Sequence, residues 1–148
     1  MWTYNSKQIE DKDIPAKALG FLYKITHVSS GKWYIGRKML SKAKTTQSKG
    51  VKVKSKVESG WRDYWSSSQD LLDYVEAEGQ DKFTREILLF CDTKACLTLG
   101  EEYMLHVTGA LFDAKCFNGN IRAKIYRKWF IKTPNFFNEL QLVLVSIK

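Results

Sequence analysis

The sequence has no apolar run long enough to cross a membrane, and its N-terminal residues lack the apolar segment of a secretory signal. A membrane-spanning helix needs about 20 consecutive apolar residues. The opening residues, MWTYNSKQIEDKDIPAK, alternate polar and charged side chains and offer no such segment. We therefore expect a cytoplasmic protein that does not associate with a membrane.

Cysteine is also scarce, with three residues in the chain. An odd number without a disulfide-framework spacing suits a reducing compartment. Cys91, Cys96 and Cys116 could join His106 in a zinc site, but the spacing matches no standard zinc motif, and two of the thiols lie in apolar stretches. The sequence favours buried free thiols over a zinc site.

Acidic residues are outnumbered, with 16 Asp and Glu against 24 Lys and Arg, for a net charge of +8. This surplus favours a polyanionic partner, above all nucleic acid. Residues 37–57 contain eight of the basic residues and no acid. We interpret them as a mobile basic loop, which either is simply solvated or follows DNA phosphates and becomes ordered on them.

A chain of 148 residues predicts one domain. Runs of aromatic and β-branched residues, turn signals and capping residues such as Ser67, Gly79 and Thr93 predict the secondary structure. The predicted elements are strands at 20–28, 33–36 and 82–91 and helices near 68–78 and 94–108. This order indicates a small α+β domain.

The two ends of the chain differ in composition from this central part. Residues 1–19 are predicted to be a polar lead-in, in which Pro15 argues against a continuous helix. Residues 122–148 are predicted to be a tail. The basic and aromatic IRAKIYRKWF suits DNA contact by base stacking, or equally a packed strand or helix. The apolar LQLVLVSIK suits an edge strand or a dimer contact, so a homodimer stays open.

Glu101 has an unusual position on the predicted helix at 94–108. It is four residues from both Leu97 and Leu105, so helical geometry places its carboxylate in an apolar stripe, whereas Glu102 falls on the polar face. A carboxylate among leucines is costly unless it is paired or binds a cation. Glu101 is thus either a rim residue paired with a lysine or a metal ligand, and oxygen ligation suits Mg²⁺.

Four motifs occur in order along the chain: FLY with WYIG, then SSSQDLLDYVEAEGQDKFTREIL, then GEEYML, then CFNG. Tyr23 and Tyr34, in the first motif, are eleven positions apart. Together the motifs resemble the GIY-YIG nuclease family over about residues 20–121, and small phage-encoded homing endonucleases in particular. The resemblance implies a three-stranded antiparallel sheet flanked by helices, and hydrolysis of phosphodiesters with one divalent metal.

The resemblance also implies roles for individual residues. Glu101 would bind Mg²⁺ or Mn²⁺. Tyr23 would be the general base or would orient the attacking water, and Tyr34 would contact a phosphate oxygen or share the base role. A phenol is a weak base at neutral pH, and the positive charges of Arg37 and Lys38 would favour its ionised form.

Two further features concern substrate binding. Asn118 corresponds to an asparagine that supports the site in the family, although Asn-Gly-Asn is also ordinary turn chemistry. The family places its catalytic arginine on a first helix, where this chain has only lysines. Arg37, directly after Gly36, is the first candidate to replace it, and Arg62 is the second.

These observations predict a Mg²⁺-dependent DNA endonuclease of phage or mobile-element type, which would act in the host-cell cytoplasm. The first alternative is a catalytically weak or inactive nucleic-acid-binding module on the same fold. The second is a protein-interaction domain whose charge serves solubility only.

Overall fold

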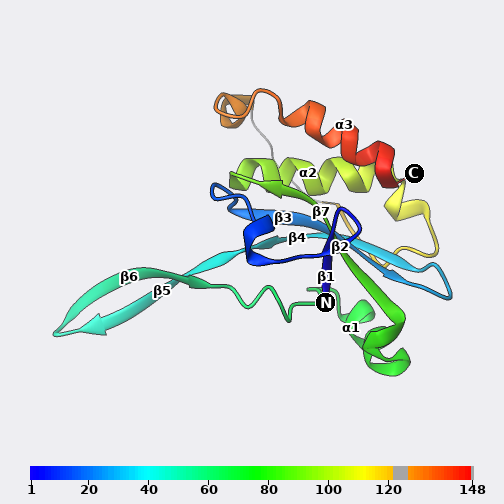
Figure 1. The fold of residues 1–148 in the computed structure, drawn as a ribbon, viewed down its shortest axis with the longest axis horizontal. Helices are drawn as coiled ribbons and strands as arrows, with labels where there is room; N and C mark the ends of the chain where they lie inside the picture. Colours follow the sequence, from blue (N-terminus) through cyan, green and yellow to red (C-terminus); the bar gives the residue numbers. More distant parts are fainter. Residues whose placement is uncertain (122–126, 148) are drawn as a thin grey trace.

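The computed structural model describes residues 1–121 and 127–147. Within them the chain forms a five-stranded mixed sheet in the order β2-β1-β7-β3-β4, a separate hairpin of β5 and β6, and helices α1 to α3 (Figure 1). The predicted α+β class is confirmed. The strands are β1 Trp2–Tyr4, β2 Lys7–Gln8, β3 Gly20–His27, β4 Trp33–Met39, β5 Ser41–Ser48, β6 Val51–Glu58 and β7 Phe83–Cys91, and the helices are α1 Gln69–Glu78, α2 Lys94–Val107 and α3 Phe136–Ile147.

The three predicted strands form the antiparallel centre of the sheet, because β3 pairs with both β4 and β7. The N-terminal residues add to it. β1 pairs in parallel with β7, and Trp2 is only 2% exposed, with its ring against Phe21 and Tyr23. The prediction that residues 1–19 are a polar lead-in is therefore wrong. Three residues of strand are too short a run to stand out in a polar stretch.

Alternation along β3 gives the sheet two buried faces. Phe21, Tyr23 and Ile25 pack on the side of α1, together with Trp61 and other aromatic residues. Leu22 packs on the opposite side, which α2 and α3 cover (Figure 1). The chain therefore has two cores, one on each face of a central strand.

The helix boundaries agree with the sequence to within one residue. Ser68 rather than Ser67 caps α1, by accepting a hydrogen bond from the Leu71 amide, and Thr93 caps α2 in the same way on the Cys96 amide. After the helices, Gly79 and Gly109 adopt positive φ angles of 95° and 65°, which end the helical path.

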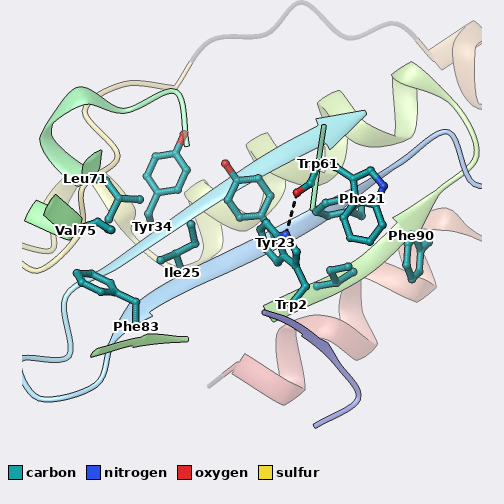
Figure 2. Packing of buried hydrophobic residues seen from close by; sticks show 11 residues of the cluster. Trp2, Phe21, Tyr23, Ile25, Tyr34, Trp61, Leu71, Val75, Phe83 and Phe90 are labelled. Carbon is teal, nitrogen blue, oxygen red and sulfur yellow. Dashed lines mark hydrogen bonds between the residues drawn. The ribbon is translucent and has the colours of Figure 1, made fainter. Parts of the chain in front are cut away.

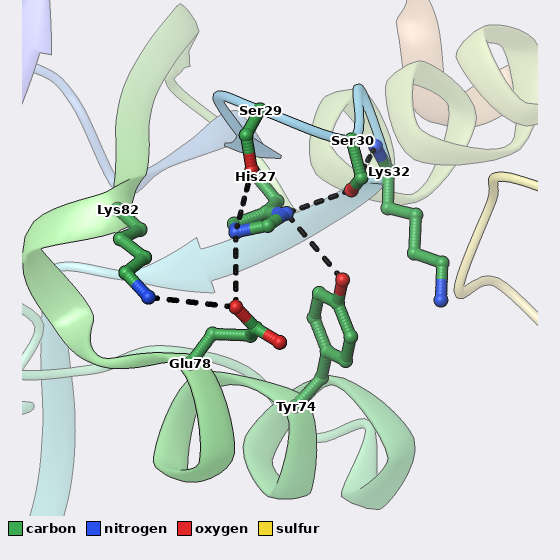
Figure 3. A network of polar contacts seen from close by, with 7 residues as sticks. All are labelled: His27, Ser29, Ser30, Lys32, Tyr74, Glu78 and Lys82. Atoms are coloured by element: carbon green, nitrogen blue, oxygen red, sulfur yellow. Dashed lines mark hydrogen bonds and ion pairs between the residues drawn. The ribbon is translucent and has the colours of Figure 1, made fainter.

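A polar network around His27 joins the β3–β4 turn to α1 (Figure 3). The buried imidazole hydrogen-bonds through Nδ1 with the Ser30 hydroxyl at 2.7 Å and lies 3.5 Å from the Tyr74 hydroxyl. Its Nε2 is 3.9 Å from a carboxylate oxygen of Glu78, which also pairs with Lys82. The network fixes α1 against the hairpin that carries the two motif tyrosines.

Residues 37–57 are strand, not loop. They complete β4 and then form the hairpin of β5 and β6, which extends away from the sheet (Figure 1). Lys49 and Gly50 have φ angles of 48° and 77°, as a two-residue type I′ turn requires. The strict alternation VKVKSKV was the signal for a strand. It was easily missed because neither face of the hairpin is buried, so neither carries a continuous apolar set.

The C-terminal part differs from prediction where the structure describes it. Residues 140–147 of the stretch LQLVLVSIK belong to α3 rather than to an edge strand, because Phe136, Leu140 and Val143 recur at helical spacing and pack against α2. The dimer contact stays a prediction. Half of IRAKIYRKWF, residues 122–126, lies outside the described residues, and Arg127–Phe130 form a short 3-10 helix.

No helix in the described part of the chain has the length and apolar character to cross a membrane.

The burial of Trp2 can be tested by Trp2→Ala. The substitution removes two aromatic contacts and the hydrogen bond from Trp2 Nε1 to the Trp61 carbonyl at 2.9 Å. We expect the free energy of unfolding to fall by about 3–5 kcal/mol in urea titrations. Val28→Ala, at a side chain that is 66% exposed, is the control and should change it by less than about 0.5 kcal/mol. If Trp2→Ala and Val28→Ala lower the free energy of unfolding by equally small amounts, β1 does not contribute to the stability of the core.

Candidate active site

The outer edge of β4 collects the polar residues of the site. β4 is the last strand of the sheet, so its outward backbone groups have no strand partner. Asn118 satisfies two of them at Ile35: its Oδ1 accepts from the Ile35 amide at 2.9 Å, and its Nδ2 donates to the Ile35 carbonyl at 2.7 Å. The Glu101 carboxylate lies beside the same strand, where it pairs with the guanidinium of Arg37, two residues further along. The edge strand thereby positions an amide and a carboxylate side by side.

The turn before Asn118 continues this edge pairing. The Trp33 amide donates to the Lys115 carbonyl and the Phe117 amide to the Trp33 carbonyl, each at 2.9 Å. The Trp33 indole also donates to Asp113 at 2.8 Å. The turn lies at residues 114–115, before Asn118, whose side chain supports the edge strand; its role in the site stays a prediction.

Helix α2 lies close to the sheet because it has glycine where the two meet. A Cβ atom at Gly100 would lie 2.5 Å from the Leu22 Cδ1 atom, and one at Gly20, on β3, would lie 2.8 Å from the Leu97 Cδ1 atom of α2. This close approach brings Glu101, the next residue of α2, to the level of β4. A glutamate oxygen is 3.1 Å from Arg37 Nε, and Arg37 also donates to the Thr98 hydroxyl.

A cavity of about 420 Å³ lies beside Glu101. We call it the carboxylate cavity, because three acidic residues contribute to its wall. Its walls come from β4, the start of α1, α2 and the turn after Phe117. The lining residues are Tyr34, Ser67, Ser68, Gln69, Asp70, Glu101, Glu102, Leu105, Phe117, Asn118, Gly119 and Asn120.

Burial raises the pKa of Glu101, and the charge of Glu102 adds to this, while the Arg37 guanidinium and amide oppose it. The expectation that Glu102 lies on the polar face of the helix is wrong, because Glu102 is only 8% exposed. Both carboxylates border the same cavity, because these two consecutive residues of α2 face the edge of the sheet and not open solvent.

The donor set suits one hard divalent cation. Within the described residues, no group of three or more His, Cys, Asp or Glu side chains comes together as a metal cage. Mg²⁺ does not need such a cage, because it is commonly bound by one or two carboxylates and keeps several waters. Glu101 is a partly buried carboxylate whose pKa stays raised despite Arg37, so an additional cation beside it would be stabilising.

Tyr23 and Tyr34 lie on neighbouring strands with their rings 6.0 Å apart, and their hydroxyls point to the same side of the sheet (Figure 2). Gly36 is the cross-strand partner of Tyr23. A Cβ atom there would lie 2.5 Å from the Tyr23 hydroxyl oxygen and 2.8 Å from Tyr34 Cε1. The glycine of the YIG motif is therefore required so that the Tyr23 ring can lie over the β4 backbone.

Burial distinguishes the two phenols. Tyr34 lines the carboxylate cavity, whereas Tyr23 is 1% exposed and donates its hydroxyl proton to Tyr64. Burial, together with the neighbouring Tyr34 and Tyr64, raises the pKa of Tyr23 well above its ordinary value. The expectation that Arg37 and Lys38 would favour a Tyr23 phenolate is wrong, because Arg37 pairs with Glu101 and Lys38 lies over Tyr64.

Tyr64 is a site residue that the sequence analysis missed. Its ring stands edge-on to Tyr23 at 6.1 Å, and the Lys38 ammonium lies 3.8 Å from its centre. Its hydroxyl accepts from Tyr23 and Ser67, although burial still raises its pKa. In the sequence Tyr64 is marked only by its place in the aromatic stretch WRDYW, from which Arg62 was chosen as the candidate site residue.

Arg62 does not reach the carboxylate cavity. It pairs with Asp11 at 2.6 Å and with Glu58 at 3.3 Å, and its guanidinium stacks on Trp61. Arg85 instead fixes this segment from below, by donating to the carbonyls of Arg62 and Tyr64 at 3.2 and 2.9 Å. The two arginines hold the Tyr64 segment in place.

A second cavity, of about 560 Å³, is lined by Arg37, whose ion-pair partner Glu101 lines the first. We call it the cation cavity, because four of its lining residues are basic and none is acidic. The basic residues are Arg37, Lys38, Lys42 and Lys94, and the others are Met39, Ser41, Ala43, Ser59, Leu97 and Thr98. Arg37 pairs with Glu101, so it stands at the border between a cavity with acidic groups and one with basic groups.

None of the three cysteines lines either cavity. Cys91 and Cys96 are buried free thiols, as predicted, and Cys116 is half-buried with its sulfur near the Asn118 amide. Burial raises the pKa of Cys91 and of Cys116. Both groups are therefore protonated thiols.

An antiparallel centre with two tyrosines on neighbouring strands, and a glutamate and an asparagine at the outer strand, defines the class of GIY-YIG proteins. The family model described as "Putative endonuclease segE, GIY-YIG domain" matches residues 2–121, and the chain belongs to this family of phage-type endonucleases. No curated protein and no solved structure matches the chain. The resemblance stated from the motifs is thereby confirmed.

The close contact at Gly36 predicts that Gly36→Ala destabilises the protein. The new methyl group must displace Tyr23 or Tyr34, and overpacking of this kind costs about 1–3 kcal/mol. Gly119→Ala is the control, because a Cβ atom at Gly119 has nothing within 4 Å. In a double-mutant cycle with Tyr23→Ala, the cost of Gly36→Ala should shrink. An unchanged cost would show that the strain lies elsewhere.

Proposed function

We propose that this protein is a metal-dependent DNA endonuclease that hydrolyses phosphodiester bonds at the carboxylate cavity. The observation that carries the proposal is the ion pair between Arg37 and Glu101 at the border of the two cavities. A phosphodiester bound to a metal cation presents a negative charge to Arg37 and a positive charge to Glu101 at the same time. Arg37 would exchange Glu101 for a phosphate oxygen, and Glu101 would exchange Arg37 for the metal.

In this proposal Glu101 holds Mg²⁺ or Mn²⁺, with Glu102 and Asp70 in the same cavity. The metal, when bound, stabilises negative charge on the phosphate and on the leaving oxygen. The water oxygen forms a new bond to phosphorus and its proton passes to solvent, while the bond to one sugar oxygen breaks and that oxygen takes up a proton and leaves as an alcohol.

The remaining residues position the substrate. Tyr34 borders the cavity and offers its hydroxyl to a phosphate oxygen. Tyr23 stays neutral and holds Tyr64 through its hydrogen bond. Lys38 and Arg37 bring positive charge from the cation cavity, and Asn118 fixes the edge of β4. Arg37 is the arginine of the site, and Arg62 acts only through the Tyr64 segment.

A phage or mobile-element role of the homing type belongs to the same proposal. The family description, which names segE, supports the phage-type assignment. The homing role rests on the sequence resemblance alone, and the choice of target would be tested by mapping cleavage sites on natural DNA.

Glu101→Gln tests the proposal directly. The amide removes the charge that would hold the metal, and loss of several kcal/mol of transition-state stabilisation corresponds to at least about a 100-fold lower cleavage rate. The measurement is plasmid cleavage with Mg²⁺, with Mn²⁺ and with EDTA, beside DNA binding in EDTA, which should be unchanged. Glu76→Gln, an exposed glutamate on α1, is the matched control and should cleave like wild type.

Binding without any cleavage by the wild-type protein, in either metal, would contradict the proposal. It would favour the alternative of a non-catalytic nucleic-acid-binding module on the same fold. Full activity of Glu101→Gln would show that Glu101 is not the metal ligand, but it would not contradict the endonuclease assignment.

The raised pKa of Glu101 predicts the acidic limb of the pH–rate profile. Only the carboxylate binds a metal, so activity should fall as the pH drops through a value above the usual range of glutamate. The charge of Arg37 lowers this pKa, so Arg37→Gln should move the limb to higher pH, besides reducing the rate. Lys94→Gln, also in the cation cavity, should leave the limb in place. If Arg37→Gln leaves the acidic limb at the same pH, the limb reports the titration of a group other than Glu101.

A further inference from the structure

The hairpin of β5 and β6 is the feature that the proposed active site leaves unexplained. It extends away from the sheet (Figure 1), and nearly all of its side chains are exposed. Val51 and Val53 are 64% and 48% exposed. A lone two-stranded hairpin without a buried face is marginally stable at best in water. Its shape and composition therefore do not serve the core of the domain.

The register of the hairpin sorts its side chains onto two faces. Lys52, Lys54 and Lys56 are opposite Gln47, Thr45 and Ala43, and alternate residues of a strand share a face. We call these three lysines the lysine row. The other face carries Val51, Val53 and Val57, together with Lys42 and Lys44. Members of the lysine row are about 7 Å apart along the strand, from two residues of rise. Successive phosphates of a DNA strand have a comparable separation.

The charge of the hairpin is not compensated locally. Residues 41–58 contain six lysines and one acid, Glu58, which already pairs with Arg62 at 3.3 Å. Among the described residues, none of these six lysines forms an ion pair. Like charges on neighbouring strand positions repel one another, so the arrangement lowers stability unless a polyanion is bound.

The hairpin is a direct continuation of the active-site strand. Only Leu40 separates β4 from β5, and its amide and carbonyl bond to the Leu19 carbonyl and the Ser59 amide, each at 3.0 Å. Ser59 also donates its hydroxyl to the Met39 carbonyl. Lys42, at the base, lines the cation cavity with Arg37. Ala43 lines the same cavity and is opposite Lys56, so the lysine row begins beside the cation cavity.

We propose that the β5–β6 hairpin is a duplex-DNA-binding arm whose lysine row lies along the phosphates of one strand and so delivers a distant phosphodiester to the carboxylate cavity. The proposal rests on the proposed function for its substrate and adds where and how that substrate is held. Contacts to phosphates carry no sequence information, so the arm binds duplexes of different sequence alike.

The test compares variants in binding to a short duplex of mixed sequence, in EDTA, over a range of salt concentrations. Lys52→Gln/Lys54→Gln/Lys56→Gln should reduce the slope of log K against log salt by about 2.7, at about 0.9 for each phosphate contact. Affinity at low salt should fall at least about tenfold, equally for unrelated sequences. The corresponding triple Lys→Arg variant keeps the charges and should retain the wild-type slope.

Two controls separate local from general effects. Lys7→Gln/Lys17→Gln/Lys132→Gln removes the same number of charges from exposed positions outside the hairpin and should leave most of the slope intact. Val51→Thr/Val53→Thr alters the other face and should bind like wild type. An equal loss for both lysine triples, or no loss for the lysine row, would overturn the proposal. A loss confined to single-stranded DNA or RNA would overturn the choice of duplex.

Failure of this inference and failure of the proposed function give different results. Wild-type cleavage with undiminished binding by the lysine-row variant rejects the arm and leaves the endonuclease. Absence of cleavage by the wild type, with a lysine-row variant that loses binding, rejects the endonuclease and leaves the arm. If both are correct, the lysine-row variant should cleave slowly at low DNA concentration but approach the wild-type rate at saturation, because Glu101 is untouched.

Discussion

The outer edge of β4 has backbone groups without a strand partner, and the side chains that satisfy them are the polar residues of the site. Asn118 bonds to both backbone groups of Ile35, and Glu101 pairs with the Arg37 side chain of the same strand. An unsatisfied buried backbone group costs about 1–3 kcal/mol, so these contacts stabilise the fold. The same contacts fix an amide and a carboxylate at one wall of the carboxylate cavity. Structure and site are thus coupled through one strand.

Glycine and aromatic residues determine how closely the surrounding elements approach that strand. Gly36 lets Tyr23 lie over β4, and Gly100 lets α2 approach Leu22. The result is a buried, neutral phenol behind the cavity and a partly buried carboxylate beside it. Burial disfavours the charged form of both groups. For Glu101 the bound cation of the proposed mechanism would offset this cost, whereas Tyr23 has no such partner and acts by holding Tyr64.

Sequence reasoning selected candidate site residues where they lie in or beside regular elements. The tyrosine spacing, the position of Glu101 on the helical wheel and the motif order selected Tyr23, Tyr34, Glu101 and Asn118. In the structure Tyr34, Glu101 and Asn118 line one cavity, and Tyr23 is buried beside Tyr34. Sequence reasoning missed Tyr64, because a tyrosine in an irregular aromatic segment has no periodic signature. It also placed Glu102 on the polar face, because helical geometry does not reveal what packs outside a helix.

By itself, the sequence determined the central strands, the helix boundaries and the family, because alternation, capping residues and motif order are local properties of the chain. The tertiary structure alone decided which charges meet. It paired Arg37 with Glu101, removed Arg62 from the site by pairing it with Asp11, and extended the basic stretch as a hairpin in line with β4. Such pairings depend on the distance between elements far apart in the chain, and no local pattern encodes that distance.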